Sequence, residues 1–169
     1  MNHLPLFVQL ENRHCLVIGG GSVAERKTRE LVASGALVTV ISPTVTIELE
    51  RLSNSGTITL VREPFADSYL DEGLLKGGQA DEEQPNADRR TPPWLIIAAT
   101  ADRALNKRVA TLAERRRILC NVVDNPDLCT FIMPAIVERG PVTIAISTSG
   151  QSPVLARWLK GLIESLLPS

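Results

Sequence analysis

A glycine-rich turn at residues 19–24 is the segment of this chain best suited to chemistry. Gly19, Gly21 and Ala24 fit the pattern G-x-G-x-x-G/A, the fingerprint of a turn that binds a dinucleotide. The first glycine permits a tight turn, the second lets a pyrophosphate approach the backbone, and the small third residue lets the next helix pack close to the strand. Backbone N–H groups at the start of that helix then face the phosphates. The predicted cofactor contacts in this segment are Gly19, Gly20, Gly21, Ser22 and Val23.

The segments on either side of the turn match the strand–turn–helix unit that the fingerprint requires. An apolar run at residues 15–18 precedes it, and a helix-like run at residues 24–34 follows it. A glycine turn in another kind of α/β protein is the alternative interpretation, because a lone match to the pattern is a weak signal.

Asp124 is the candidate for proton chemistry. It follows the apolar run at residues 118–123, so we expect it at the C-terminal end of a parallel strand, where open α/β sheets place their ligands. A carboxylate in that position can accept a proton as a general base. The alternative is that Asp124 only caps the turn into Asn125 and Pro126, since aspartate is common before turns.

Strand-like and helix-like runs alternate along most of the chain. The predicted strands are residues 15–18, 36–41, 57–61, 94–100 and 118–123, and the predicted helices are residues 24–34, 45–52 and 103–117. This alternation predicts an α/β fold with a Rossmann-type parallel sheet and right-handed crossovers. Gly35 is expected to end the first helix, and Asp102 is expected to cap the third.

Residues 71–93 interrupt this alternation. They are polar and rich in glycine and proline, and they cannot bury enough apolar surface to order themselves. We predict that they form a mobile loop inserted in the Rossmann domain.

The pattern changes again after residue 124. Residues 130–137 and 141–148 are rich in β-formers and flank a predicted turn at residues 138–140, which indicates a β-hairpin. Ser152 and Pro153 are expected to begin a last helix as its N-cap and first residue. The apolar face of that helix is broad, so it needs a partner surface.

We therefore predict a division of the chain into two regions. Residues 1–124 form the Rossmann domain, and residues 125–169 form the hairpin-and-helix region.

Composition excludes several classes of protein. The net charge of −1 gives no argument for nucleic-acid binding, and no apolar run approaches the length of a membrane span. The N-terminus does not resemble a signal peptide. Cys15, Cys120 and Cys129 are odd in number and lack metal-site spacing, which argues against a disulfide framework and a structural zinc site and favours a reducing cytoplasm. His3 and His14 are isolated, so no metal ligands are predicted.

Several strings along the chain together resemble the N-terminal module of siroheme synthase, the bifunctional precorrin-2 dehydrogenase/sirohydrochlorin ferrochelatase family. The specific ones are Asn-Val-Val-Asp at residues 121–124, Phe-Ile-Met-Pro-Ala at residues 131–135 and Ser-Pro-Val-Leu-Ala-Arg at residues 152–157. The resemblance covers nearly the whole chain except residues 71–93. It implies NAD-dependent oxidation of precorrin-2 to sirohydrochlorin, followed by Fe²⁺ insertion to give siroheme.

The same resemblance implies a homodimer in which residues 125–169 belong to the dimerisation region. Members of the family continue into further helical residues, so this region is expected to be incomplete. NAD itself comes from the resemblance: Ser42, Pro43 and Thr44 should lie near the adenosine ribose, yet the acid usual at that position is missing.

Roles can also be given to individual residues. By the resemblance, Asp124 matches the essential aspartate of the family. Thr100 and Ala101 come at the end of the fourth predicted strand, so they are expected to form a wall of the nicotinamide pocket. The candidates for orienting the tetrapyrrole are Asn121, Ser147, Thr148, Ser149 and Arg157. For these polar residues a role inside their own turns is the alternative.

A non-catalytic Rossmann module that senses nucleotides is the alternative function. Such a module needs neither the Asp124 carboxylate nor a hydroxyl-rich turn.

Overall fold

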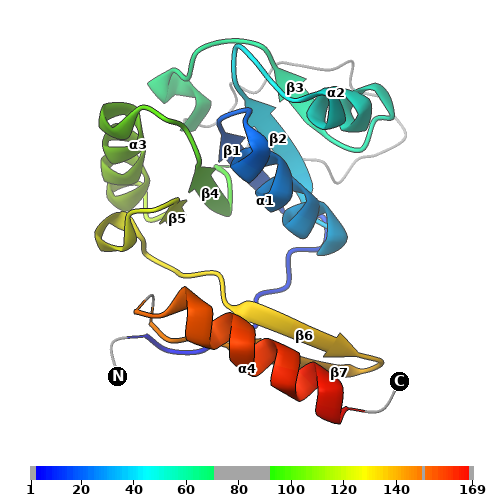
Figure 1. Cartoon of the computed structure of the whole chain (residues 1–169). Coiled ribbons are helices and arrows are strands. Elements are labelled where there is room, and N and C mark those ends of the chain that lie inside the picture. The colour runs from blue at the N-terminus through cyan, green and yellow to red at the C-terminus, as the bar shows by residue number, and fades with distance from the viewer. Residues whose placement is uncertain (1–2, 71–91, 150, 168–169) are drawn as a thin grey trace. The chain divides into compact units, whose positions relative to one another are not determined.

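The computed structural model describes residues 3–70, 92–149 and 151–167, which belong to two compact units (Figure 1). One unit is Phe7–Thr130, and the other combines the described residues of Met1–Leu6 and Phe131–Ser169. The first unit thus continues past residue 124, where the sequence suggested a division. The predicted insertion at residues 71–93 lies outside the described residues, apart from Pro92 and Pro93.

A parallel sheet of five strands forms the centre of the first unit (Figure 1). Its spatial order is β3 (Thr59–Val61), β2 (Leu37–Ile41), β1 (His14–Ile18), β4 (Leu95–Ala98) and β5 (Leu119–Val122). This order confirms the predicted Rossmann-type fold. The order of strands reverses between β1 and β4, the point at which open α/β sheets form a ligand crevice beyond their carboxyl ends.

Within the described residues, the connections between these strands contain three α-helices: α1 (Ser22–Ala33), α2 (Ile47–Asn54) and α3 (Arg103–Arg115). Gly35, with φ 76°, follows α1 as predicted. Asp102 caps α3 as predicted, because its Oδ1 accepts the N–H groups of Ala104 and Leu105 at 2.8 and 3.0 Å. Two short 3₁₀ helices, η1 (Asp67–Leu70) and η2 (Pro126–Leu128), were not predicted, since they are too short to show a helical period.

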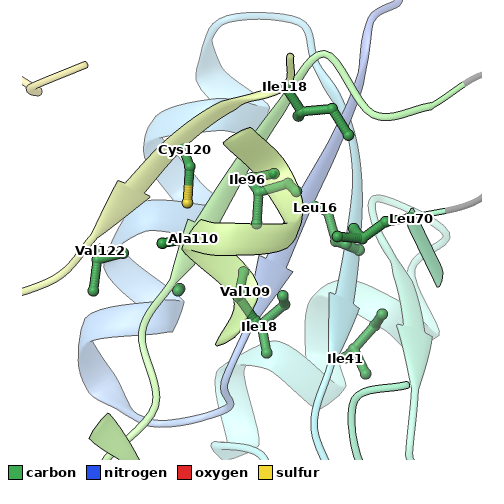
Figure 2. Close-up of a cluster of buried hydrophobic side chains, with 12 residues drawn as sticks. Leu16, Ile18, Ile41, Leu70, Ile96, Val109, Ala110, Ile118, Cys120 and Val122 are labelled. Carbon is green, nitrogen blue, oxygen red and sulfur yellow. The ribbon is translucent and has the colours of Figure 1, made fainter. Parts of the chain in front are cut away.

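The core lies between the sheet and α3 (Figure 2). Alternate strand residues point to this face, so Leu16 and Ile18 of β1 meet Val109 of α3. Each of these side chains is almost fully buried, which contributes about 1.5–3 kcal/mol per side chain. Burial on this scale fixes the strand ends and therefore the loops that follow them.

The outer edge of β5 is covered by the residues that follow it. Thr130 Oγ1 accepts the Cys120 N–H at 2.7 Å, and the Thr130 N–H donates to the Cys120 carbonyl at 2.8 Å. The Val122 N–H donates to Cys129 Sγ at 3.2 Å. These bonds explain why the segment up to Thr130 belongs to the first unit.

The second unit is a β-hairpin with one helix packed on it. Strands β6 (Ala135–Arg139) and β7 (Val142–Ile146) are antiparallel, and α4 (Pro153–Leu166) contacts both. Ser152 caps α4 by accepting the Leu155 N–H at 3.3 Å, as predicted.

The hairpin strands differ from the prediction in their bounds. The first strand begins at Ala135 instead of residue 130, and the predicted turn residues 138 and 139 belong to β6. The turn is Gly140-Pro141 instead, because Gly140 adopts φ 54° and the proline ring fixes a negative φ beside it.

No helix within the described ranges is long and apolar enough to cross a bilayer.

Candidate active site

A cleft of about 800 Å³ lies at the carboxyl ends of the parallel strands. The loops after β1, β2, β4 and β5 line it, with Pro64 and Phe65 from the segment after β3. The cleft residues that the sequence singled out are Gly19, Gly20, Gly21, Ser22, Val23, Ser42, Pro43, Thr44, Thr100, Ala101 and Asp124. The fold therefore brings every predicted cofactor residue together with the predicted base.

The glycine turn is shaped by its neighbours on both sides. Gly19 has φ 122°, and a Cβ there would collide with the carbonyl group of Ala99. A Cβ on Gly20 would collide with the Thr44 carbonyl oxygen and lie 2.8 Å from Ser42 Oγ. Only glycine fits at these two positions without a shift of the backbone.

Gly21 differs from the other two glycines, because a Cβ there would meet nothing within 4 Å. Gly21 is also the N-cap of α1 and provides no side-chain cap. The N–H groups of the first turn of α1 thus start beside open space in the cleft. Uncapped N–H groups at the start of a helix bind phosphate well. The turn therefore fits the pyrophosphate of a dinucleotide.

The end of β2 is tied to the glycine turn. The Thr46 N–H donates to the Gly20 carbonyl at 3.0 Å, and Ser42 Oγ donates to the Thr44 carbonyl at 2.7 Å. The Ser42 hydroxyl therefore has a structural role in shaping this loop. Among the lining residues that the structure describes, Asp102 and Asp124 carry the formal charges, and none is a lysine or an arginine.

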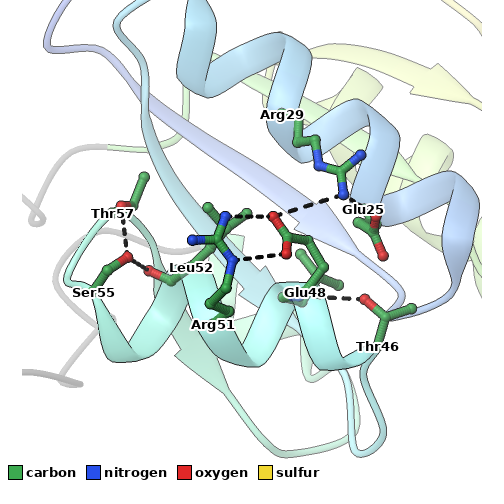
Figure 3. A network of polar contacts seen from close by, with 9 residues as sticks. Glu25, Arg29, Thr46, Glu48, Arg51, Leu52, Ser55 and Thr57 are labelled. Atoms are coloured by element: carbon green, nitrogen blue, oxygen red, sulfur yellow. Dashed lines mark hydrogen bonds and ion pairs between the residues drawn. The ribbon is translucent and has the colours of Figure 1, made fainter.

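The side chain of Glu48, the first acid after β2, points toward Arg51 (Figure 3). Its two carboxylate oxygens accept from Arg51 Nε and a terminal nitrogen of Arg51, each at 2.8 Å, and Arg29 lies 3.7 Å away. The hydrogen bond from Arg51 lowers the pKa of Glu48. Glu48 does not line the cleft. The ribose acid of common NAD sites is thus missing from the end of β2.

The wall after β4 is held by a buried asparagine on α3. Asn106 is 6% exposed, and its side chain bonds to the Thr100 N–H, carbonyl and hydroxyl groups. The Thr100 hydroxyl also accepts the Asp102 N–H at 3.2 Å. Thr100 lines the cleft, but its hydroxyl is engaged within this turn.

Asp124 stands exposed at the end of β5 and lines the cleft. It has φ 59°, a conformation that aspartate tolerates better than most residues. Within the described ranges its carboxylate makes no hydrogen bond or ion pair, and η2 is not capped by a side chain. The carboxylate is consequently available to a ligand.

Asn121 does not line the cleft. It is half-buried, and its Nδ2 lies 3.6 Å from Cys129 Sγ. The other predicted tetrapyrrole contacts are in the second unit. There the Ser147 hydroxyl accepts the Ser149 N–H at 3.0 Å, and the Thr148 hydroxyl accepts the Ser152 N–H at 3.1 Å.

Sequence reasoning missed Pro64, Phe65 and Asn106. Pro64 and Phe65 follow β3, and the rule that parallel strands end at one edge would have placed them on the cleft. Asn106 carried no local signal, because an asparagine in a helix is ordinarily exposed.

Comparison with known proteins agrees with this geometry. Residues 6–135 match the family model described as "Putative NAD(P)-binding". The chain belongs to this family. The predicted nicotinamide cofactor agrees with the family's description. Residues 139–166 match a second family model, described as "Sirohaem biosynthesis protein central".

Individual relatives extend the comparison. Siroheme synthases of Salmonella dublin and Escherichia coli K12 are each 46% identical to this chain over 168 residues. The match covers 99% of this chain and 32% of each relative, so the chain spans about a third of their length. The predicted resemblance to siroheme synthase is thereby confirmed.

One solved structure of similar fold is SirC, a precorrin-2 dehydrogenase. It has a TM-score of 0.77 and 26% sequence identity to this chain, with 98% of this chain and 72% of that chain covered.

Proposed function

We propose that this chain oxidises precorrin-2 to sirohydrochlorin with NAD⁺. The observation that carries the proposal is the placement of the Asp124 carboxylate, which has no partner among the described residues, on the same cleft as the glycine turn. The name of the SirC structure, precorrin-2 dehydrogenase, and the family's description support it.

The residues of the cleft have separate roles in cofactor binding and proton removal. The glycine turn and the start of α1 would hold the pyrophosphate, while Thr100 and Ala101 would border the nicotinamide. A bound nicotinamide accepts a hydride from the substrate. Loss of a hydride leaves a proton to be removed, and Asp124 takes that proton as the general base. Precorrin-2 and NAD⁺ thus give sirohydrochlorin, NADH and one proton.

Iron insertion is a second proposed step, supported by the similarity to siroheme synthases. Fe²⁺ enters as a substrate, and two pyrrole N–H protons must leave. Asp124 is suited to accept such protons. Across the described residues no cluster of three His, Cys, Asp or Glu side chains is placed to hold a metal, so the nitrogens of the macrocycle would be the main iron ligands.

Ser147, Thr148, Ser149, Asn121 and Arg157 remain the proposed tetrapyrrole contacts. Arg157 is the best supported, because it is exposed and, in the described part of the chain, has no ionic or hydrogen-bonding partner. A guanidinium suits the carboxylates of such a substrate.

A homodimer is also proposed. Val154, Trp158, Leu162 and Leu166 are spaced four residues apart on α4 and are 68%, 61%, 43% and 73% exposed. A contiguous apolar stripe of this kind marks a protein interface, which supports pairing of α4 with a second copy. The three free thiols support a reducing, cytoplasmic location.

The test is an assay with precorrin-2 and NAD⁺ that follows the tetrapyrrole absorbance and NADH formation together. Wild-type protein should oxidise the substrate, and Asp124→Asn should lose at least about 100-fold in kcat. Asparagine also tolerates a positive φ, so this variant keeps the backbone and should retain NAD⁺ affinity.

If the wild type does not oxidise precorrin-2, the proposed dehydrogenase activity is wrong. NAD⁺ binding without oxidation would indicate a nucleotide sensor instead. Full activity of Asp124→Asn would remove Asp124 from the mechanism.

A further inference from the structure

We propose that Asn106 is a positioning residue for the cofactor: it sets the wall of the cleft formed by residues 99–101. The assignment rests on the proposed binding of a dinucleotide in this cleft. Asn106 does not line the cleft itself, so any effect it has must pass through Thr100.

The Asn106 side chain forms hydrogen bonds with every polar group of Thr100. Its Nδ2 donates to the Thr100 carbonyl at 2.9 Å, and its Oδ1 accepts the Thr100 hydroxyl at 2.7 Å and the Thr100 N–H at 3.4 Å. The amide thus replaces the neighbouring strand that Thr100 lacks once β4 has ended at Ala98. With an NH2 donor group and an acceptor oxygen in a fixed plane, an asparagine side chain can satisfy a backbone N–H and carbonyl together.

The segment of residues 99–101, which Asn106 holds through Thr100, packs directly against the glycine turn. The Ala99 N–H donates to the Ile18 carbonyl at 2.8 Å, and a Cβ on Gly19 would lie 3.3 Å from the Thr100 nitrogen and collide with the Ala99 carbonyl. A shift of residues 99–101 would therefore change the opening between this wall and the phosphate-binding turn. Displacements of about 1 Å at a binding wall are enough to weaken a ligand many-fold.

Because Asn106 is buried, its hydrogen bonds hold Thr100 in a fixed position. Only 6% of the residue is exposed, and its removal would leave the Thr100 N–H and carbonyl without the partners they have in the wild type. Unpaired polar groups in a buried site are costly, and the segment would move to reach new partners. The helix itself does not need this side chain, because Asp102 already caps α3.

The first experiment measures the dissociation constant for NAD⁺ by titration of the full chain, well below the melting temperature of each variant. Asn106→Ala should bind NAD⁺ at least about tenfold more weakly than wild type. Thr39→Val is the matched control, because it removes another buried hydrogen bond, from Thr39 Oγ1 to His14 Nε2 at 3.1 Å, away from the cleft. The control should lower the melting temperature and leave the dissociation constant unchanged.

A second variant, Asn106→Asp, gives a readout that a stability defect cannot produce. A protonated carboxyl group has the shape, the donor and the acceptor of the asparagine amide, whereas a carboxylate has no donor for the Thr100 carbonyl. Burial at this position raises the pKa of an introduced carboxyl group, so the protonated form is populated at mildly acidic pH. The dissociation constant of this variant, divided by that of wild type at the same pH, should therefore approach one at pH 5 and rise about tenfold or more by pH 8. Asp102 and Asp124, the charged residues that line the cleft, and Arg103 and Lys107 at the start of α3 are common to both proteins.

The outcomes separate the two proposals. If wild type does not bind NAD⁺, the proposed function is wrong and this assignment falls with it. If wild type binds but folded Asn106→Ala binds within twofold of it, or if Thr39→Val is weakened equally, only the positioning role is wrong. A flat pH ratio for Asn106→Asp would overturn the positioning role even if Asn106→Ala does not fold.

Discussion

Gly20 and Thr44 lie backbone against backbone, so closely that a Cβ on Gly20 would collide with the Thr44 carbonyl oxygen. The Thr46 N–H, two residues further on, donates to the Gly20 carbonyl at 3.0 Å. The loop after β2 and the glycine turn therefore move as one piece, and the cleft depends on a residue with no side chain.

Gly20→Ala and Gly21→Ala should separate stability from binding. Gly20→Ala forces the two loops apart and should cost about 1–3 kcal/mol in the free energy of unfolding. Gly21→Ala has free space for its methyl group, so its stability should match wild type while NAD⁺ affinity falls at least about tenfold, because the methyl occupies the approach of the pyrophosphate. Denaturant unfolding and NAD⁺ titration measure both effects. Equal behaviour of the two variants would contradict this account of the turn.

Cofactor preference should follow the charges of the cleft. Described lining residues include two carboxylates and no cation, so the extra phosphate of NADP⁺ finds no partner and NAD⁺ should bind more tightly. Thr44→Arg places a cation where we expect the adenosine ribose, and NADP⁺ affinity should rise about tenfold. Thr57→Arg, at an exposed position outside the cleft, is the control for a general charge effect. An equal gain in both variants would show that Thr44 is not near the ribose.

Stability should fall at alkaline pH because of two buried thiols. Burial raises the pKa of Cys15 and of Cys120 from 9.0 to about 12. Between these values the unfolded chain loses protons that the folded chain keeps, so the free energy of unfolding decreases as pH rises from about 9 to 12, by up to about 1.4 kcal/mol per pH unit for each thiol.

Denaturant unfolding across that pH range checks this prediction. Cys15→Ala should make the slope shallower while lowering stability at pH 7. A slope identical to that of wild type would mean that the Cys15 thiol is not the titrating group.

Replacement of Trp158 by lysine should yield a monomer. Trp158 is 61% exposed within its own chain, so the change removes little packing inside the fold while placing a charge in the apolar stripe of α4. Light scattering coupled to size exclusion measures the molecular mass. Thr111→Lys adds the same charge at an exposed position on α3 and should leave the mass unchanged. If wild type is itself monomeric, the proposed dimer is wrong.

Local patterns in the sequence were sufficient for the sheet but not for every detail around it. Apolar β-branched runs predict the strands, since a parallel sheet is covered on both faces. The hairpin bounds were misplaced because the turn depends on the φ of a single residue, Gly140, which composition does not reveal.

In the site, too, residues marked by a local sequence pattern could be predicted, whereas roles that depend on long-range contacts could not. The glycine pattern follows β1 and Asp124 follows β5, so the rule that parallel strands end at one edge of the sheet places them on one cleft. The role of Asn106 could not be predicted, because it depends on a contact with Thr100 across a turn. By contrast, spacing alone indicated that Glu48 comes too late in the sequence to be the ribose acid, and in the structure it bonds to Arg51 outside the cleft.

The covering of β5 by Cys129 and Thr130 has a consequence for how copies of this chain meet. A bare edge strand invites another strand to add to the sheet and starts aggregation. Here the outward N–H groups of Cys120 and Val122 are already bonded, and β3 at the opposite edge is only three residues long. Both edges of the sheet are thus protected from the addition of another strand, so a second copy would have to bind through side chains instead.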